Sequence, residues 1–408
     1  MPSWLMACRS SGLRCDATSA DRTPTLQPRS TTVPGGSSAS VSTMPGVRLT
    51  RRASGWVALV ALALTVSACS SSSGGSNVPD ASGTGVGQAV PIPGLSIAAI
   101  ACSQRSCLAG GQGSDPAQAR LVTTTDGGST WSRVTDPLAD QLDVAALSCT
   151  ADGWCLATGT TPGTGVPGAL VTTNGGTTWH QGYPPSSAAP PSALDCIADQ
   201  LCFATDVGQL LETTTGAATW QLVATMPATL STVWSLACPS ALRCLLAGAH
   251  LTGPSTSVGV LAAASPGNRW RLDPLPAGVG SGPATAVSCG GPMNCVAALN
   301  ATGSALRSPT ASASTLVSSD GGLTWSTGGS LNLNQVLSIA CASTKVCSAV
   351  GTTTGSTSGA AATTADGGKS WSPIALSFAP SALLSTSCSS TTRCTAVGVQ
   401  TLLTLLPA

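Results

Sequence analysis

The sequence is poor in charged and aromatic residues. Only 8% of its 408 residues are charged and 3% are aromatic, with one Tyr and two Phe. It contains two Lys, Lys345 and Lys369, against fifteen Arg, and a single Glu, Glu212. From Ser70 onward ten basic residues oppose fourteen acidic ones, a net charge of −4. We therefore expect no nucleic-acid partner and no polybasic docking on a membrane, because no basic stripe is present.

Long helical periodicity is also missing. The chain instead combines 46 Gly and 28 Pro with short alternating segments of Val, Leu, Ala and Thr. This composition predicts many short strands joined by turns.

Cysteine is abundant, and most of it is paired. Fourteen of the 17 Cys form close pairs whose first members are 42 to 52 residues apart. The pairs are Cys102/Cys107, Cys149/Cys155, Cys196/Cys202, Cys238/Cys244, Cys289/Cys295, Cys341/Cys347 and Cys388/Cys394. This period suits a four-stranded propeller blade. It predicts an all-β fold, a single seven-bladed β-propeller of antiparallel blades, over residues 86–408.

A turn motif recurs at the same period. Intact copies span 124–131, 318–325 and 364–371, each reading Ser/Thr-x-Asp-Gly-Gly-x-Thr/Ser-Trp. The motif resembles the Asp-box, or bacterial neuraminidase repeat, of a family that includes sialidases, sortilin-type receptors, a photosystem II assembly factor and xyloglucan hydrolases. Asn174 replaces the Asp in the second copy, and Thr215 and Ala217 replace Asp and Gly in the third. The fourth copy keeps little of the motif beyond Gly267 and Trp270. We expect weaker turns in blades 3 and 4.

The chemistry of this motif is structural. An Asp or Asn side chain accepts hydrogen bonds from backbone N–H groups just after it, glycine supplies positive φ, and the Trp buries a large indole between blades. We expect such roles for Asp126, Gly128, Trp131, Asn174, Gly176, Trp179, Trp220, Trp270, Asp320, Gly322, Trp325, Asp366, Gly368 and Trp371.

The cysteine pairs are read as local disulfides, each stapling a short hairpin between the first two strands of a blade. Zinc is the alternative for close Cys pairs. Seven blades would keep the pairs apart, and only His180 and His250 are available as further ligands, so we expect no metal and no cofactor.

The N-terminal part carries export signals. Residues 1–43 lack apolar periodicity, and we expect them to lie upstream of a true start at Met44. Residues 44–69 have a basic start, an apolar run too short to span a bilayer, and the ending Val66-Ser67-Ala68-Cys69. That ending resembles the bacterial lipobox, which implies lipidation of Cys69; a cleaved but non-lipidated signal is the alternative.

Residues 70–85 form a Ser/Gly-rich linker. We therefore expect a lipid-anchored monomer on the extracytoplasmic side of a bacterial cell membrane.

The last blade is incomplete in sequence. After Cys394 the chain has residues for two strands and then ends without a turn motif or Trp. We expect the strand 87–92 to supply the missing fourth strand and close the ring, which would protect both edges.

Functional residues are expected on the face with variable loops, since rigid scaffolds carry binding there. The residues on this face that could bind a ligand or act in catalysis are Arg120, Asp140, Asp143, Tyr183, His250 and Arg307. We expect each of them to be a solvated loop residue rather than part of a site. The sialidase activity of the resembling family would need three arginines and a Tyr/Glu pair, which one Tyr and one Glu do not provide. We expect a non-catalytic binding or assembly module for an envelope protein or glycan, with a glycoside hydrolase using two Asp on surface polysaccharide as the alternative.

Overall fold

The computed structural model describes residues 86–407 except 105, 116–119, 187, 207, 227–229, 231, 252–256, 266–268, 278, 280–281, 302–311, 354–357 and 377–379. The described strands belong to one compact unit, Val78–Ala408. The predicted segments 1–43, 44–69 and 70–85, with Cys69, lie outside the described residues, and so does Arg307.

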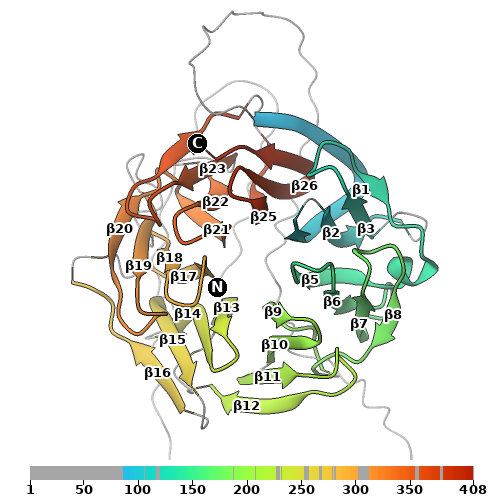
Figure 1. Cartoon of the computed structure of the whole chain (residues 1–408), viewed down its shortest axis with the longest axis horizontal. Helices are drawn as coiled ribbons and strands as arrows, with labels where there is room; N and C mark the ends of the chain where they lie inside the picture. Colours follow the sequence, from blue (N-terminus) through green and yellow to red (C-terminus); the bar gives the residue numbers. More distant parts are fainter. Residues whose placement is uncertain are drawn as a thin grey trace, which may run out of the picture. The chain divides into compact units, whose positions relative to one another are not determined.

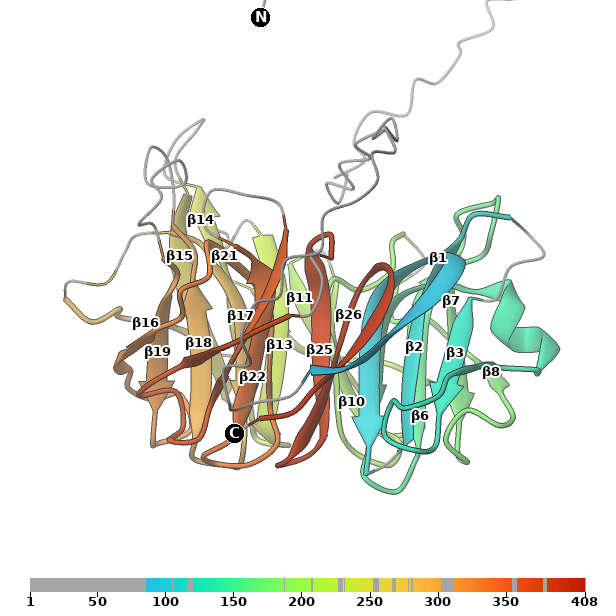
Figure 2. The same cartoon turned by 90° about the horizontal axis from the view of Figure 1, so that it is seen from above.

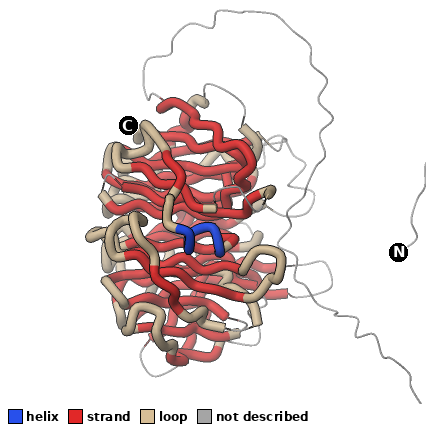
Figure 3. Tube along the Cα trace, turned by 90° about the vertical axis from the view of Figure 1, so that its right-hand side faces the viewer, coloured by secondary structure: helices blue, strands red, loops and turns tan. Residues whose placement is uncertain are grey.

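This unit is an all-β propeller whose sheets are arranged around a central axis (Figure 1). Almost all of its regular structure is strand, with the short 3-10 helix η1 (Pro137–Gln141) at its edge (Figure 3). Strands such as Cys295–Leu299 are buried along their whole length, as expected when both faces of a blade are covered.

Five sheets have four antiparallel strands each. They are β5 (Asp143–Cys149), β6 (Cys155–Thr160), β7 (Pro167–Thr172) and β8 (His180–Gly182); β9 (Leu194–Ala198), β10 (Leu201–Asp206), β11 (Gln209–Thr213) and β12 (Gln221–Thr225); β13 (Thr232–Ser240), β14 (Arg243–Leu251), β15 (Ser257–Ser265) and β16 (Arg269–Asp273); β17 (Ala284–Cys289), β18 (Cys295–Leu299), β19 (Ser314–Ser318) and β20 (Ser326–Ser330); and β21 (Gln335–Cys341), β22 (Cys347–Thr352), β23 (Gly359–Thr364) and β24 (Ser372–Ile374).

The sixth sheet has six strands and joins the two ends of the unit. Its order is β25-β26-β1-β2-β3-β4. The bounds are β25 (Leu383–Ser390), β26 (Arg393–Leu405), β1 (Val86–Ser103), β2 (Ser106–Gly113), β3 (Leu121–Thr124) and β4 (Ser132–Arg133).

The predicted count of seven four-stranded blades is therefore wrong, because the described residues form five four-stranded sheets and one six-stranded sheet. The physical reason is the length of β1, which runs unbroken for 18 residues. Its first part pairs with β26, with Val90 opposite Leu402, and its second part pairs with β2, with Ile100 opposite Ala109 (Figure 2). Residues expected in the first and last blades thus share one sheet.

The hydrophobic core is divided among the interfaces between neighbouring sheets. Trp179 packs with Leu108 and Leu121 of the preceding sheet and Leu170 of its own. Trp325 and Trp371 occupy the corresponding places at later interfaces. Each indole contributes a large buried area, so these Trp residues stabilise the packing of one sheet against the next.

The innermost strands are also joined by hydrogen bonds. β1, β5, β9, β13, β17, β21 and β25 each contain the first cysteine of a pair, and most of them are labelled nearest the centre in Figure 1. At six boundaries a side-chain oxygen of one inner strand accepts from a backbone N–H of the next: Ser148 from Cys196, Asp195 from Cys238, Ser235 from Val287, Ser288 from Cys341, Ser338 from Thr386, and Ser387 from Cys102.

Candidate binding face

Strand register separates the unit into two faces. In the first repeat Cys107 lies opposite both Cys102 and Thr124, so the hairpin between the first two strands and the turn after the third strand share one face. The same register recurs at Cys155 and Cys347. We call this the disulfide face, and we call the opposite face, where the other loops lie, the loop face.

All seven predicted disulfides are present. Their Cα atoms are 3.8–4.1 Å apart, and the sequence separation is five or six residues. Each cross-links directly opposed strand positions where the register is continuous, as at Cys289 and Cys295. Short loops of this kind staple hairpins rather than linking one sheet to another.

The second cysteine of each pair is buried, which the spacing alone did not reveal. Cys202 lies opposite its partner Cys196. Cys244 faces a stretch of β13 whose register is irregular between Ala237 and Ser240, so its disulfide does not join a regular pair of opposed residues. Cys202 and Cys244 are thus structural cross-links within the core and not residues of an accessible site. The second cysteines, each in a different core cluster and 0–2% exposed, are Cys107, Cys155, Cys202, Cys244, Cys295, Cys347 and Cys394.

Each of the three intact turn motifs on the disulfide face is closed by one carboxylate. In the first, Asp126 Oδ1 accepts from the N–H groups of Ser129 and Thr130, and Oδ2 accepts from the Thr130 hydroxyl at 2.6 Å. These bonds, led by that from the Thr130 hydroxyl, hold the pKa of Asp126 far below its usual value. Such carboxylates are ionised structural acceptors rather than proton donors or bases.

Asp320 and Asp366 repeat this arrangement. Burial acts to raise their pKa values, but the hydrogen bonds to their carboxylates outweigh it and lower each to about 2. Each of the three intact turns also has two consecutive glycines at positive φ, including Gly321 at 71° and Gly322 at 83°.

The altered turns keep much of this geometry. Asn174 Oδ1 accepts from the Thr178 N–H, and its amide nitrogen donates to the Thr178 hydroxyl. In the next turn the Thr215 hydroxyl replaces the carboxylate as acceptor for Thr219 N–H, and Ala217 adopts φ 65°. A neutral acceptor and a strained Ala stabilise a turn less than Asp and Gly do.

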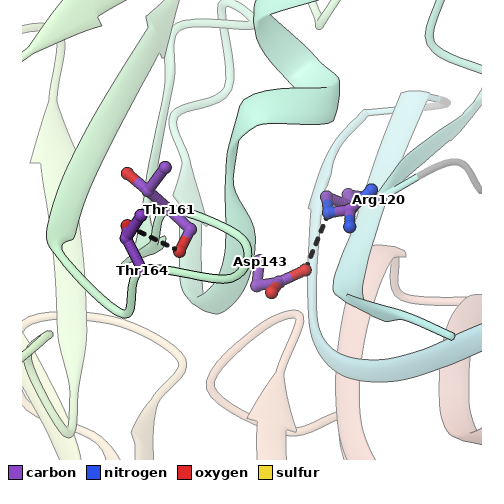
Figure 4. Close-up of polar contacts among 4 residues, drawn as sticks. All are labelled: Arg120, Asp143, Thr161 and Thr164. Carbon is purple, nitrogen blue, oxygen red and sulfur yellow. Dashed lines mark hydrogen bonds and ion pairs between the residues drawn. The ribbon is translucent and has the colours of Figure 1, made fainter. Parts of the chain in front are cut away.

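On the loop face, the expected solvated residue Arg120 is in fact buried. Its side chain is 3% exposed, and its Nε donates to Asp143 Oδ1 at 2.8 Å (Figure 4). Asp143 begins β5, so this ion pair links the loop before β3 to the next sheet. Nearby, the loop from β6 to β7 is held by the Thr164 hydroxyl donating to Thr161 O (Figure 4). Arg120 is a structural cation and is not available to bind a ligand.

The neighbouring acidic residues have structural partners too. Asp140, in η1, accepts from Arg133 at 2.5 Å in a partly exposed ion pair. Asp136 caps the same helix by accepting from Leu138 N–H, and it also accepts from Trp179 N–H. Arg120, Asp143, Asp140 and Asp136 thus each have a structural partner.

The other candidates lie apart. Tyr183 is 68% exposed just after β8, and its carbonyl accepts from the Trp220 indole N–H at 2.9 Å. His250 is half-buried near the end of β14. No group of three or more metal-ligating residues occurs in the part of the chain described. Among those same residues, no helix is long and apolar enough to cross a membrane.

Surface hollows are small. One of about 170 Å³ is lined mainly by 312–315 and 327–330, and another of about 170 Å³ lies beside Asp366. Typical small-molecule pockets are several hundred Å³. Neither hollow is lined by the described candidates, which are Arg120, Asp140, Asp143, Tyr183 and His250.

Sequence reasoning missed two inner-strand residues. Asp195 occupies the position before the first cysteine, where Ser148, Ser288 and Ser387 stand in other repeats. Trp234 is 43% exposed on β13, although most Trp of this chain are in turn motifs. An alignment of the repeats on their cysteines would have revealed both residues. Asp195 is the one acidic residue and Trp234 the one aromatic residue at its position in the repeats.

The chain was compared with known proteins. No protein-family model and no curated protein sequence matches it. The solved structure of YCF48 bound to a D1 peptide is 17% identical, with a TM-score of 0.55, over 79% of this chain and 96% of that one. YCF48 from Cyanidioschyzon merolae is 14% identical, with a TM-score of 0.53, over 78% and 98%.

A GH74 xyloglucanase from Xanthomonas campestris is 12% identical, with a TM-score of 0.56, over 78% of this chain but 53% of that one. All three likenesses establish the same feature. This chain has the β-propeller fold. Fold likeness at such identities does not transfer a function.

Proposed function

We propose that this chain is a non-catalytic binding or assembly module for a protein of the bacterial envelope. The observation that carries the proposal is the state of the loop-face ionisable groups. Arg120 is buried against Asp143, Asp140 pairs with Arg133, and Asp136 caps η1. Each of these side chains stabilises the scaffold through its partner. This arrangement suits a rigid ring that presents its loops to a binding partner.

A protein partner is favoured by the structural neighbours. YCF48, which has the same fold, has been solved with a D1 peptide bound. The low charge of the chain and its stapled hairpins are consistent with a preorganised surface, which reduces the entropy lost on binding.

The proposed module is a closed ring of Asp-box repeats. In this proposal the first part of β1 closes the ring as the outer strand beside β26. The register of Val86 with Leu405 supports this closure. The hydrogen bonds around Asp126, Asp320 and Asp366 support the Asp-box resemblance.

We further propose that Cys69 is lipidated after removal of residues 44–68, that 70–85 is a tether, and that 86–408 is displayed outside the cytoplasmic membrane. The lipobox-like ending and seven disulfides support export. Replacing Cys69 with Ala tests this: the variant should leave the membrane fraction, and its retention there at equal level and size would contradict lipidation.

A glycan ligand, or hydrolysis of a surface polysaccharide by two Asp, is the second candidate. It is favoured by the likeness to the xyloglucanase, of which this chain spans 53%. Hydrolysis would require two carboxylates facing each other about 5–10 Å apart across a groove.

One experiment separates these candidates. The chain is crosslinked to its neighbours in intact cells and recovered, and the purified chain is incubated with a panel of polysaccharides. A reproducible protein partner without hydrolysis supports the module. Hydrolysis that is lost in Asp140→Asn or Asp143→Asn, with the fold retained, would contradict it.

A further inference from the structure

The position four residues before the first cysteine is unusual in every repeat; it lies on the inner strand in six repeats and just before β9 in the third. The residues there are Ala98, Ala145, Ser192, Trp234, Thr285, Leu337 and Leu384. Four of them are exposed and three are half-buried, although they lie at the innermost strands of a packed propeller. We call them the inner ring.

Backbone irregularities set this position apart. At six of the seven residues, all except Ser192, the pairing register skips the residue: Trp234, for example, falls between Val233 opposite Gly248 and Ser235 opposite Ala247. The same skip occurs at Ala98, Ala145, Thr285, Leu337 and Leu384. A bulge leaves one residue unpaired and re-aims its side chain, and bulges concentrate beside binding sites.

The ring lies toward the loop face. The cysteines are at the disulfide-face end of these strands, and a residue four positions earlier lies about 13 Å away along an extended strand. On β13 it is the third residue from the opposite end. The inner ring therefore lies in the loop-face half of the inner strands, around the central axis of the propeller.

The chemistry of the ring is apolar. Five of the seven side chains are hydrocarbon or indole, and none is charged. The two hydroxyls are already hydrogen-bonded within the protein, Ser192 with Thr205 Oγ1 and Thr285 with Val336 O. Trp234 is the largest of the seven side chains and is 43% exposed.

We infer that the inner ring is the anchor site for an uncharged, apolar side chain of a peptide segment in the protein partner, with Trp234 as its main contact. This inference rests on the proposed binding function and names its site. A charged group would find no counter-ion among these seven residues. A sugar would find the two hydroxyls engaged, whereas an apolar side chain needs only the contact area that the ring offers.

The chain's own linker does not suit the site. Residues 70–85 are mostly Ser and Gly and offer little apolar surface. A peptide backbone can also pair here, because β5, β9, β13, β17, β21 and β25 are edge strands of their sheets, with no strand of the sheet on the side toward the central axis.

The test selects short random-sequence peptides on the full chain with its disulfides formed, and then measures their affinity for variants. We expect the selected peptides to share an apolar residue, Trp234→Ala to weaken binding about ten-fold or more, and Trp234→Phe to restore most of it. Leu242→Ala is the matched control, since Leu242 is 69% exposed on the disulfide face of the same sheet. Unchanged disulfides and melting temperature show that each variant is folded.

Three outcomes would overturn the inference: peptides that bind Trp234→Ala as tightly as wild type, selected peptides with a charged consensus and no apolar anchor, or no peptide enrichment at all. The crosslinking experiment judges the proposed function separately. If Trp234→Ala still captures the cellular partner, the inner-ring site is wrong but the binding module stands. If no partner is captured from wild-type cells, the proposed function fails as well.

Discussion

The carboxylate of Asp195 accepts a 2.6 Å hydrogen bond from the backbone N–H of Cys238, across the boundary between β9 and β13. At the equivalent boundaries Ser148, Ser288 and Ser387 supply a neutral hydroxyl instead. Burial raises the pKa of Asp195 to about 6, and the bond from Cys238 offsets only part of that effect. Asp195 is thus the one ionisable acceptor among the six hydrogen bonds that join the inner strands as described above, and the other five acceptors are Ser hydroxyls.

This difference predicts a pH dependence of stability. A carboxyl whose pKa rises from 3.8 in the unfolded chain to about 6 in the folded protein stabilises the fold when protonated. Its contribution is complete below pH 3.8 and is lost as the pH rises to about 6. Asp195→Asn, which stays neutral, should therefore be more stable than wild type at about pH 8 by roughly 2–3 kcal/mol.

Denaturant unfolding of wild type and Asp195→Asn at about pH 4 and pH 8 measures the difference in their unfolding free energies at each pH. The advantage of the Asn variant should shrink at the lower pH. Asp195→Ser is the second variant, because it restores the residue used at three other boundaries. Parallel pH profiles for wild type and Asp195→Asn would contradict the assignment.

The two loop-face ion pairs should differ in their importance. Asp143→Ala leaves the Arg120 guanidinium buried without its carboxylate, so we expect a loss of about 3–5 kcal/mol in unfolding free energy. Asp140→Ala breaks a pair whose Arg133 side chain is 47% exposed, and should cost about 1 kcal/mol or less. Chemical denaturation of the two variants measures both values, and equal losses would show that burial does not set the strength of these pairs.

The Asp320 turn offers a third prediction. Asp320→Ala removes the acceptor for the Leu323 and Thr324 N–H groups and for the Thr324 hydroxyl. We expect a loss of roughly 1–3 kcal/mol, seen as a lower denaturation midpoint. Asp152→Ala, at an exposed position in another disulfide-face loop, is the matched control. A loss no larger than that of the control would mean that the carboxylate adds little to the turn.

Much of this architecture could be predicted because it repeats. The cysteine spacing identified the propeller and its disulfides, and the Asp-Gly-Gly turns marked where third strands end. Local chemistry fixes these features, since the partners lie within a few residues of each other. The departures from the motif at Asn174 and Thr215 were also visible in the sequence, and the weaker turns expected in blades 3 and 4 stay a prediction.

The errors concern partners that are distant in the sequence. Arg120 was expected in solvent, but Asp143 of the next sheet binds it in a buried site. The spacing of the cysteine pairs predicted a first and a last blade, but β1 pairs with strands of both, so they form one sheet. Trp234 lies where the register of β13 skips a residue, and a single sequence does not reveal such a bulge.

The N-terminal part of β1 gives the last prediction, which concerns ring closure. Val90 and Pro91 lie opposite Leu402 and Thr401, and the buried Leu402 packs in a cluster with Val90 and Ile92 against it. Deleting the chain up to Ile92 would expose the edge of β26 and the apolar surface of this cluster. We expect aggregation or a clearly lower melting temperature, measured by light scattering and calorimetry. A chain that begins at Val86 is the matched control, because it lacks the leader and tether but keeps the strand. If both truncated chains melt at the same temperature and stay monomeric, the strand does not close the ring.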